Sequence, residues 1–130
     1  MAVSAQFSNQ PNNGALAQAA IANAGRDGSG TVVTVFTAGK FGARIERLIV
    51  KAVVTTTAGM LRLFLQSGGT TRLIHEELVT AITASATVAA FSAVISGGAF
   101  PLVMAPDAVL IACTEKAEAM NVIPVEAGNF

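Results

Sequence analysis

The sequence predicts an all-β protein, an antiparallel β-sandwich of jelly-roll-like form with about eight strands and an N-terminal arm. From Thr31 onward, short runs of β-branched and apolar residues are separated by Gly, Ser, Thr or Pro at intervals of roughly ten residues, which is typical of antiparallel sheets. No amphipathic stretch is long enough for the helix of a βαβ crossover. The length of 130 residues fits a single domain.

The first part of the chain differs from the rest, and we interpret residues 1–30 as an arm on a sandwich domain formed by residues 31–130. Within the arm, Ser8–Gly14 has turn composition, Ala15–Ala24 is an alanine-rich stretch that could form a short helix, and Gly25–Gly30 is expected to be a flexible connector.

The larger apolar residues of the arm are too few to form a core alone. The arm is therefore expected to lie on the domain or to reach a neighbouring subunit, with a partly ordered terminus as the alternative. The residues expected to contact a partner are Phe7, Leu16 and Ile21.

Each strand of the sandwich domain is predicted from alternation and from bounding turn residues. In the second expected strand, Ile45 is out of phase with Leu48, which predicts a bulge or bend near Glu46. Pro124 predicts an edge position or a terminus for the last strand. The expected strands are Thr31–Thr37, Arg44–Val54, Met60–Gln66, Thr71–Val79, Thr87–Ile95, Phe100–Met104, Ala108–Thr114 and Ala119–Val125.

Composition restricts the function classes. Eight basic and eight acidic residues give no net charge, which disfavours a nucleic-acid partner. Only 12% of residues are charged, so we expect the surface to be covered in an obligate oligomer or a larger assembly. Leu78–Pro106 has no charged residue, but its Ser, Thr, Gly and Pro residues favour strands and loops over a membrane span.

Groups for catalysis or metal binding are scarce, and we expect no enzyme activity, cofactor or metal. The chain has one His, one Cys, and no Trp or Tyr. On a strand, His75 and Glu77 share a face and offer two metal ligands where a stable site needs three or four. Cys113 is expected to pack as a small apolar group. The basic residues of neighbouring strands, Arg44, Arg47, Lys51, Arg62 and Arg72, are expected to form cross-strand pairs with glutamates on a solvated face.

Several segments carry a family resemblance: Asp27-Gly28-Ser29-Gly30 leading into Thr31–Phe36, then Arg44–Arg47, Thr56–Phe64, Phe100–Leu102 and Asn121–Ile123. Over Asp27 to Phe130, this pattern resembles small proteins encoded among the virion genes of tailed bacteriophages and prophages. Such proteins are similar in size and all-β character to capsid decoration, or cement, proteins, which sit as symmetric trimers on the assembled shell and reinforce it.

The resemblance implies a structural protein of the virion, made in the bacterial cytoplasm and placed at the capsid surface. Its expected partners are further copies of itself, with a trimer favoured, and the major capsid protein or other virion proteins. A tail, fibre or head–tail joining component is the alternative within the structural class. From another class, a small ligand- or carbohydrate-binding β-sandwich remains open.

Overall fold

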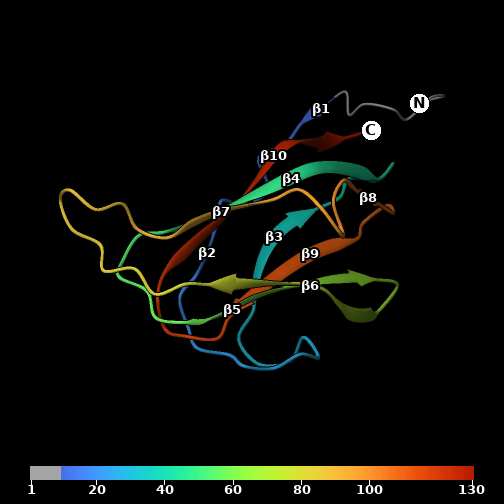
Figure 1. Cartoon of the computed structure of the whole chain (residues 1–130). Coiled ribbons are helices and arrows are strands. Elements are labelled where there is room, and N and C mark those ends of the chain that lie inside the picture. Colours follow the sequence, from blue (N-terminus) through green and yellow to red (C-terminus); the bar gives the residue numbers. More distant parts are fainter. Residues whose placement is uncertain (1–9) are drawn as a thin grey trace.

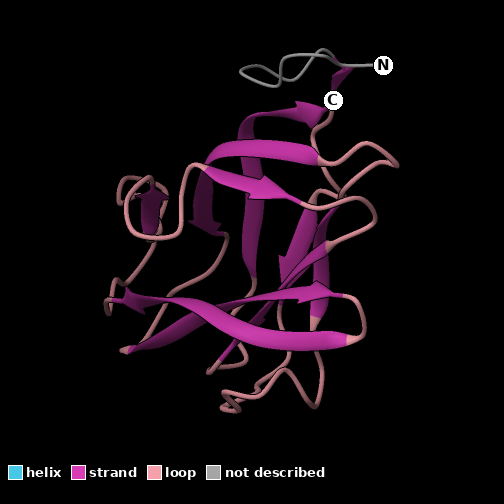
Figure 2. Ribbon diagram, turned by 90° about the vertical axis from the view of Figure 1, so that its right-hand side faces the viewer, coloured by secondary structure: helices cyan, strands magenta, loops and turns pink. Residues whose placement is uncertain are grey.

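The computed structural model describes residues 10–130, and all regular structure in this range is β-strand (Figure 2). The all-β prediction is confirmed, and a strand is present within each of the eight expected ranges, although residues 87–91 of the expected strand Thr87–Ile95 are loop. Two more come from the arm. Among residues 10–130 there is accordingly no helix long and apolar enough to cross a membrane. The ten strands are β1 (Gln10–Pro11), β2 (Ala17–Ala19), β3 (Val33–Thr37), β4 (Ala43–Ala52), β5 (Gly59–Ser67), β6 (Thr70–Val79), β7 (Ser92–Ile95), β8 (Leu102–Met104), β9 (Val109–Thr114) and β10 (Met120–Asn129).

The strands form two antiparallel sheets that face each other (Figure 1). In the first, sheet A, β10 and β4 lie at the centre; β1 and β2 pair with the other side of β10, and β7 and β8 pair with the other side of β4. The second, sheet B, has the order β3-β9-β5-β6. The core lies between the sheets, where Leu48 and Val122 of sheet A and Leu61, Leu63 and Leu110 of sheet B are fully buried. Burying these side chains is the main stabilising contribution to the sandwich.

The change of phase on which the predicted bulge or bend near Glu46 was based is present in β4, but the pairing with β10 has no bulge there, because Arg47 is opposite Val125 and Ile45 is opposite Ala127. Ile45 and Leu48 are both fully buried, so the inward–outward alternation of β4 changes phase between them. On the neighbouring β10, Glu126 has a left-handed φ of 52°. The edge partner of β4 changes at the same place, because residues 43–45 pair with β8 and residues 48–51 pair with β7.

The expectation that Pro124 marks an edge strand is wrong for β10 as a whole. This strand pairs with β4 along its length, and Pro124 is opposite Leu48. On its other side, however, the pairing with β2 ends at Val122 and the pairing with β1 begins at Gly128. The proline therefore lies in a stretch of β10 that lacks a strand partner on that side, where a missing N–H group can be tolerated.

The short helix considered for residues 15–24 is not formed, because part of this stretch is strand β2. Ala17 and Ala19 are buried in the core, and Gln18 between them is exposed and donates a hydrogen bond to Asn121 Oδ1 at 2.9 Å. Leu16 has a left-handed φ of 50°, which a helix does not allow. Packing of small side chains against the core thus outweighs the helix propensity of alanine.

Beyond β2 the chain crosses from sheet A to sheet B. Ala22 bridges to Thr114 at the end of β9, and the Asn23 backbone N–H donates to the Thr114 carbonyl at 2.8 Å. On the approach to β2, the Ala15 N–H donates to the Val35 carbonyl of β3 at 3.0 Å. The described part of the arm is therefore an integral side of the sandwich.

Residues 23–31 form a loop, which we call the strap, that lies over the outer face of sheet B (Figure 1). The Asn23 side chain organises it by donating from Nδ2 to the carbonyls of Ser29 and Thr31, both at 2.8 Å, and by accepting from the Gly25 N–H. Gly28, at φ 83°, lies so close to β6 that an added Cβ would be 2.6 Å from Thr71 Cγ2. These contacts fasten the segment that was expected to be a flexible connector.

Candidate interaction surface

An apolar row crosses the outer face of sheet A. Ile49 of β4 is the register partner of Ile123 on β10 and of Val94 on β7, and all three side chains point away from the core. Ile49 and Val94 are exposed, and Ile123 is half-buried. Leu16, which precedes β2 on the other side of β10, is exposed as well. This apolar row of Ile123, Ile49 and Val94 runs across the outer face of sheet A from β10 to the edge strand β7.

Charged groups that border the apolar row are engaged by neighbouring atoms of the chain. Arg47 Nη2 is 3.1 Å from Glu126 Oε1. Lys51 Nζ donates to the Ala90 carbonyl at 2.8 Å. An apolar centre with a polar border is the usual arrangement of a protein–protein interface.

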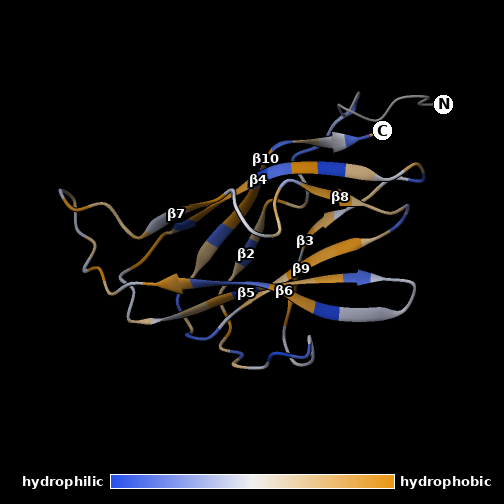
Figure 3. Ribbon diagram, turned by 45° about the vertical axis from the view of Figure 1, so that its right-hand side comes forward, coloured by the Kyte–Doolittle hydropathy of each residue, from blue (hydrophilic) through white to orange (hydrophobic). Residues whose placement is uncertain are grey.

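One edge of sheet A has no charged side chain. The stretch between Glu77 and Asp107 contains neither acidic nor basic residues, and it supplies β7, β8 and the projecting loop of residues 80–91. Val88, Val94 and Val103 are 47%, 58% and 60% exposed. Figure 3 shows the projecting loop in orange and pale shades. We call β7, β8 and this loop the uncharged edge, and its lack of charge is typical of an interface core.

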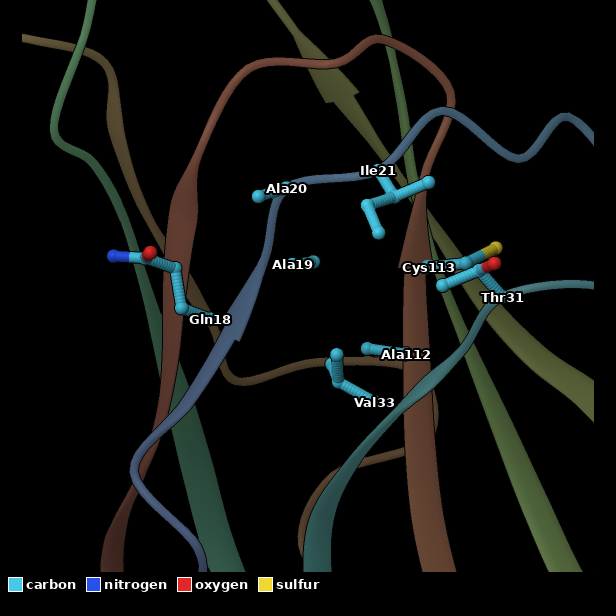
Figure 4. Close-up of a pocket in the computed structure, with 8 residues that line it drawn as sticks. All are labelled: Gln18, Ala19, Ala20, Ile21, Thr31, Val33, Ala112 and Cys113. Carbon is cyan, nitrogen blue, oxygen red and sulfur yellow. The ribbon is translucent and has the colours of Figure 1, made fainter.

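The opposite edge of sheet A carries two of the residues predicted to contact a partner. Leu16 and Ile21, just before and after β2, are 64% and 62% exposed. Phe7 lies outside the described residues. Beneath Ile21 is a cavity of about 110 Å³, lined mostly by apolar groups of the arm, β3 and β9 (Figure 4). We call residues 16–21, with this cavity, the arm edge.

Sequence reasoning selected Leu16 and Ile21 but did not select the exposed valines of the uncharged edge. Both selected residues are exposed, as a contact with a partner requires, although whether they make one stays a prediction. A signal that could have identified Val88, Val94 and Val103 is the absence of charged residues from Leu78 to Pro106. In the sequence, this absence was considered only as evidence for or against a membrane span.

The single histidine pairs with a carboxylate on β6. His75 Nε2 and Glu77 Oε1 are 2.9 Å apart, and both side chains are partly buried on the same side of the strand, as predicted. Across residues 10–130, no three side chains of metal-binding type gather in one place. The pair thus offers two potential ligands, below the number that a stable metal site needs.

The expected cross-strand ion pair between Arg62 and Glu76 is present, but not on a solvated face. Arg62 is only 4% exposed, and its Nε donates to Glu76 Oε2 at 2.8 Å. Arg26 of the strap donates from its own Nε to the same oxygen at 2.8 Å. Hydrogen bonds from Arg62 and then Arg26 hold the pKa of Glu76 below its usual value. The carboxylate therefore joins the strap to sheet B.

Cys113 lies beside Arg62 in the register of sheet B and is buried, as predicted. Burial raises the pKa of its thiol, and the nearby positive charge of Arg62 opposes this effect. The thiol is therefore held in its neutral form and packs as an apolar group.

Glu76→Gln is expected to reduce the pH dependence of stability. Folding lowers the pKa of Glu76. The ionised carboxylate therefore stabilises the folded protein at pH values above 4.5, the ordinary pKa of the group, and this stabilisation is lost as the pH falls through the lowered pKa. The difference in melting temperature between wild type and Glu76→Gln should therefore be largest at neutral pH and shrink below about pH 4.5.

Thermal melts between pH 7 and pH 3 would measure this difference, with Arg26→Gln as the control. That variant keeps the hydrogen bond from Arg62, which lowers the pKa of Glu76 more than Arg26 does, and should retain most of the acid-dependent loss. An unchanged difference across the whole range would contradict the role of the carboxylate.

Comparison with known proteins identifies no relative: no family model, no curated protein and no solved structure matches the chain.

Proposed function

We propose that this chain is a structural, self-associating β-sandwich of a tailed-phage virion, with capsid decoration as its leading role. The observation that carries the structural part of the proposal is the apolar row, which crosses the outer face of sheet A and reaches the uncharged edge at β7. Contiguous exposed apolar surface of this kind marks sites of protein association. The assignment to a phage virion rests on the sequence resemblance.

Such a protein acts through binding alone. A protein that binds only the assembled shell stabilises it by the free energy of its contacts, multiplied over many copies. The proposed partners are other copies of this chain, in a trimer, and the major capsid protein at the capsid surface. The zero net charge is consistent with a protein partner and offers no electrostatic attraction to nucleic acid.

The purified protein is expected to be an oligomer whose mass does not change with concentration, and a trimer is the state that the resemblance implies. Light scattering over a range of concentrations measures this mass. Refractive-index detection is required because the chain has no Trp or Tyr. A stable species of 13.2 kDa would contradict self-association and would favour a small ligand-binding module.

Attachment to the shell is tested by sedimentation with capsids of the phage that encodes the chain. The protein should sediment with assembled shells and stay in solution with unassembled capsid protein. Sedimentation with isolated tails instead of shells would replace decoration by the tail or joining role.

A further inference from the structure

We propose that copies of this chain associate head to tail, with the arm edge of one copy packed against the uncharged edge of the next. This inference rests on the self-association proposed above and specifies the two surfaces that meet.

The two edges lie on opposite sides of the same sheet. Strands β1 and β2 pair with one side of β10, whereas β7 and β8 pair with the far side of β4. Within the described residues, the outer sides of β2, β7 and β8 have no strand partner in sheet A. The uncharged edge therefore presents apolar side chains together with backbone groups that are free to pair with another chain. The arm edge presents apolar side chains, because the residues on either side of β2 are hydrogen-bonded to β3 and β9.

The charge distribution allows these two edges to meet without burying a charge. The arm carries no charged residue before Arg26, and the second edge is uncharged from Leu78 to Pro106. Every acidic and basic residue of the protein lies outside these two segments. A contact between the two edges therefore leaves the charges in water, whereas a contact of either edge with β6 would bury Arg72 or Glu76 at a cost in desolvation.

The cavity of the arm edge is suited to one aliphatic side chain. Figure 4 shows Ile21 on one side of it and Val33 and Ala112 on the other. Its volume of about 110 Å³ is smaller than the ~150 Å³ of an apolar cavity that admits benzene, so a valine side chain is of suitable size. Val88, in the projecting loop of the uncharged edge, is exposed and close in sequence to the free strand β7.

Because the two edges are different surfaces, the contact is heterologous. A heterologous contact leaves one arm edge and one uncharged edge free after two copies have joined, and further copies add until the ring closes. This geometry is compatible with the trimer expected from the resemblance, whereas an isologous contact would stop at two copies.

Two single variants and their mixture test the inference. Ile21→Asp places a charge on the arm edge, and Val94→Asp places one on the uncharged edge; each variant alone should fall to the mass of a monomer. An equimolar mixture should form a one-to-one dimer. In this dimer, the intact uncharged edge of Ile21→Asp binds the intact arm edge of Val94→Asp. The two edges left free are the ones that carry the substitutions, so no further copy can add and the ring cannot close.

Phe41→Asp is the matched control, because Phe41 is 57% exposed and belongs to neither edge; this variant should keep the mass of the wild type. Val88→Asp, in a loop, repeats the test if Val94→Asp does not fold, and far-UV circular dichroism establishes folding for every variant.

A mixture that stays monomeric would overturn the head-to-tail contact, as would single variants that keep the wild-type mass. In both cases the wild type would remain an oligomer, so self-association would stand. A wild type that is itself monomeric would overturn self-association and the inference together.

Discussion

Replacing Phe64 by alanine is expected to lower the free energy of unfolding by about 3–5 kcal/mol. Phe64 is fully buried although it lies on the outer face of sheet B, away from the main core. There it packs with Ile111 and Cys113 beneath the strap. Truncation would remove a large apolar contact area and leave a cavity, because the backbone of sheet B restricts collapse. Urea unfolding followed by far-UV circular dichroism would measure the change.

Phe41→Ala provides the comparison for the same chemical change at an exposed position. It should alter the free energy of unfolding by no more than about 0.5 kcal/mol. If Phe64→Ala had an equally small effect, the strap could not be covering Phe64 in solution.

Gly14→Ala is expected to destabilise the protein by about 2–5 kcal/mol. A left-handed backbone costs alanine about 1–2 kcal/mol, and Gly14 has a φ of 73°. In addition, an added Cβ would be 2.3 Å from the Val35 carbonyl oxygen, so the arm or β3 must shift. Overpacking of this kind costs about 1–3 kcal/mol. Equilibrium unfolding in urea measures the total.

Gly68→Ala separates the two contributions. Gly68 also has a left-handed φ, at 58°, but no atom lies within 4 Å of an added Cβ. This variant should cost only the backbone contribution of about 1–2 kcal/mol. Equal effects at the two glycines would mean that the arm is not packed closely against β3.

The strands could be predicted from sequence because their signals are local. Leu61 and Leu63 point into the core as their spacing indicates, and the spacing of Ile45 and Leu48 correctly indicated a change of phase in β4. The burial of Arg62 could not be predicted, because alternation assigns it to an outward face. What covers that face is a strap located more than thirty residues earlier in the chain.

For the candidate surface too, the features that depend on nearby residues could be predicted, and those that depend on strand pairing could not. Leu16 and Ile21 stand out as large residues in a stretch of alanines, so composition was sufficient to select them. The strand pairing of Ala17 and Ala19 was not visible, because alanine favours a helix unless a partner strand is available. The apolar row depends on the register that aligns Ile123, Ile49 and Val94, which come from three distant segments.

The pairing of β1 with the end of β10 places Gln10 opposite Asn129. Residues close to the two ends of the chain therefore meet at one corner of sheet A. A covalent link between the ends, with new termini opened at the Gly68–Gly69 turn, would give a circular permutant that keeps every strand and both sheets. In such a permutant β5 and β6 would no longer be consecutive, so their hairpin would have to form as a long-range contact, and folding would slow while the folded architecture stayed the same.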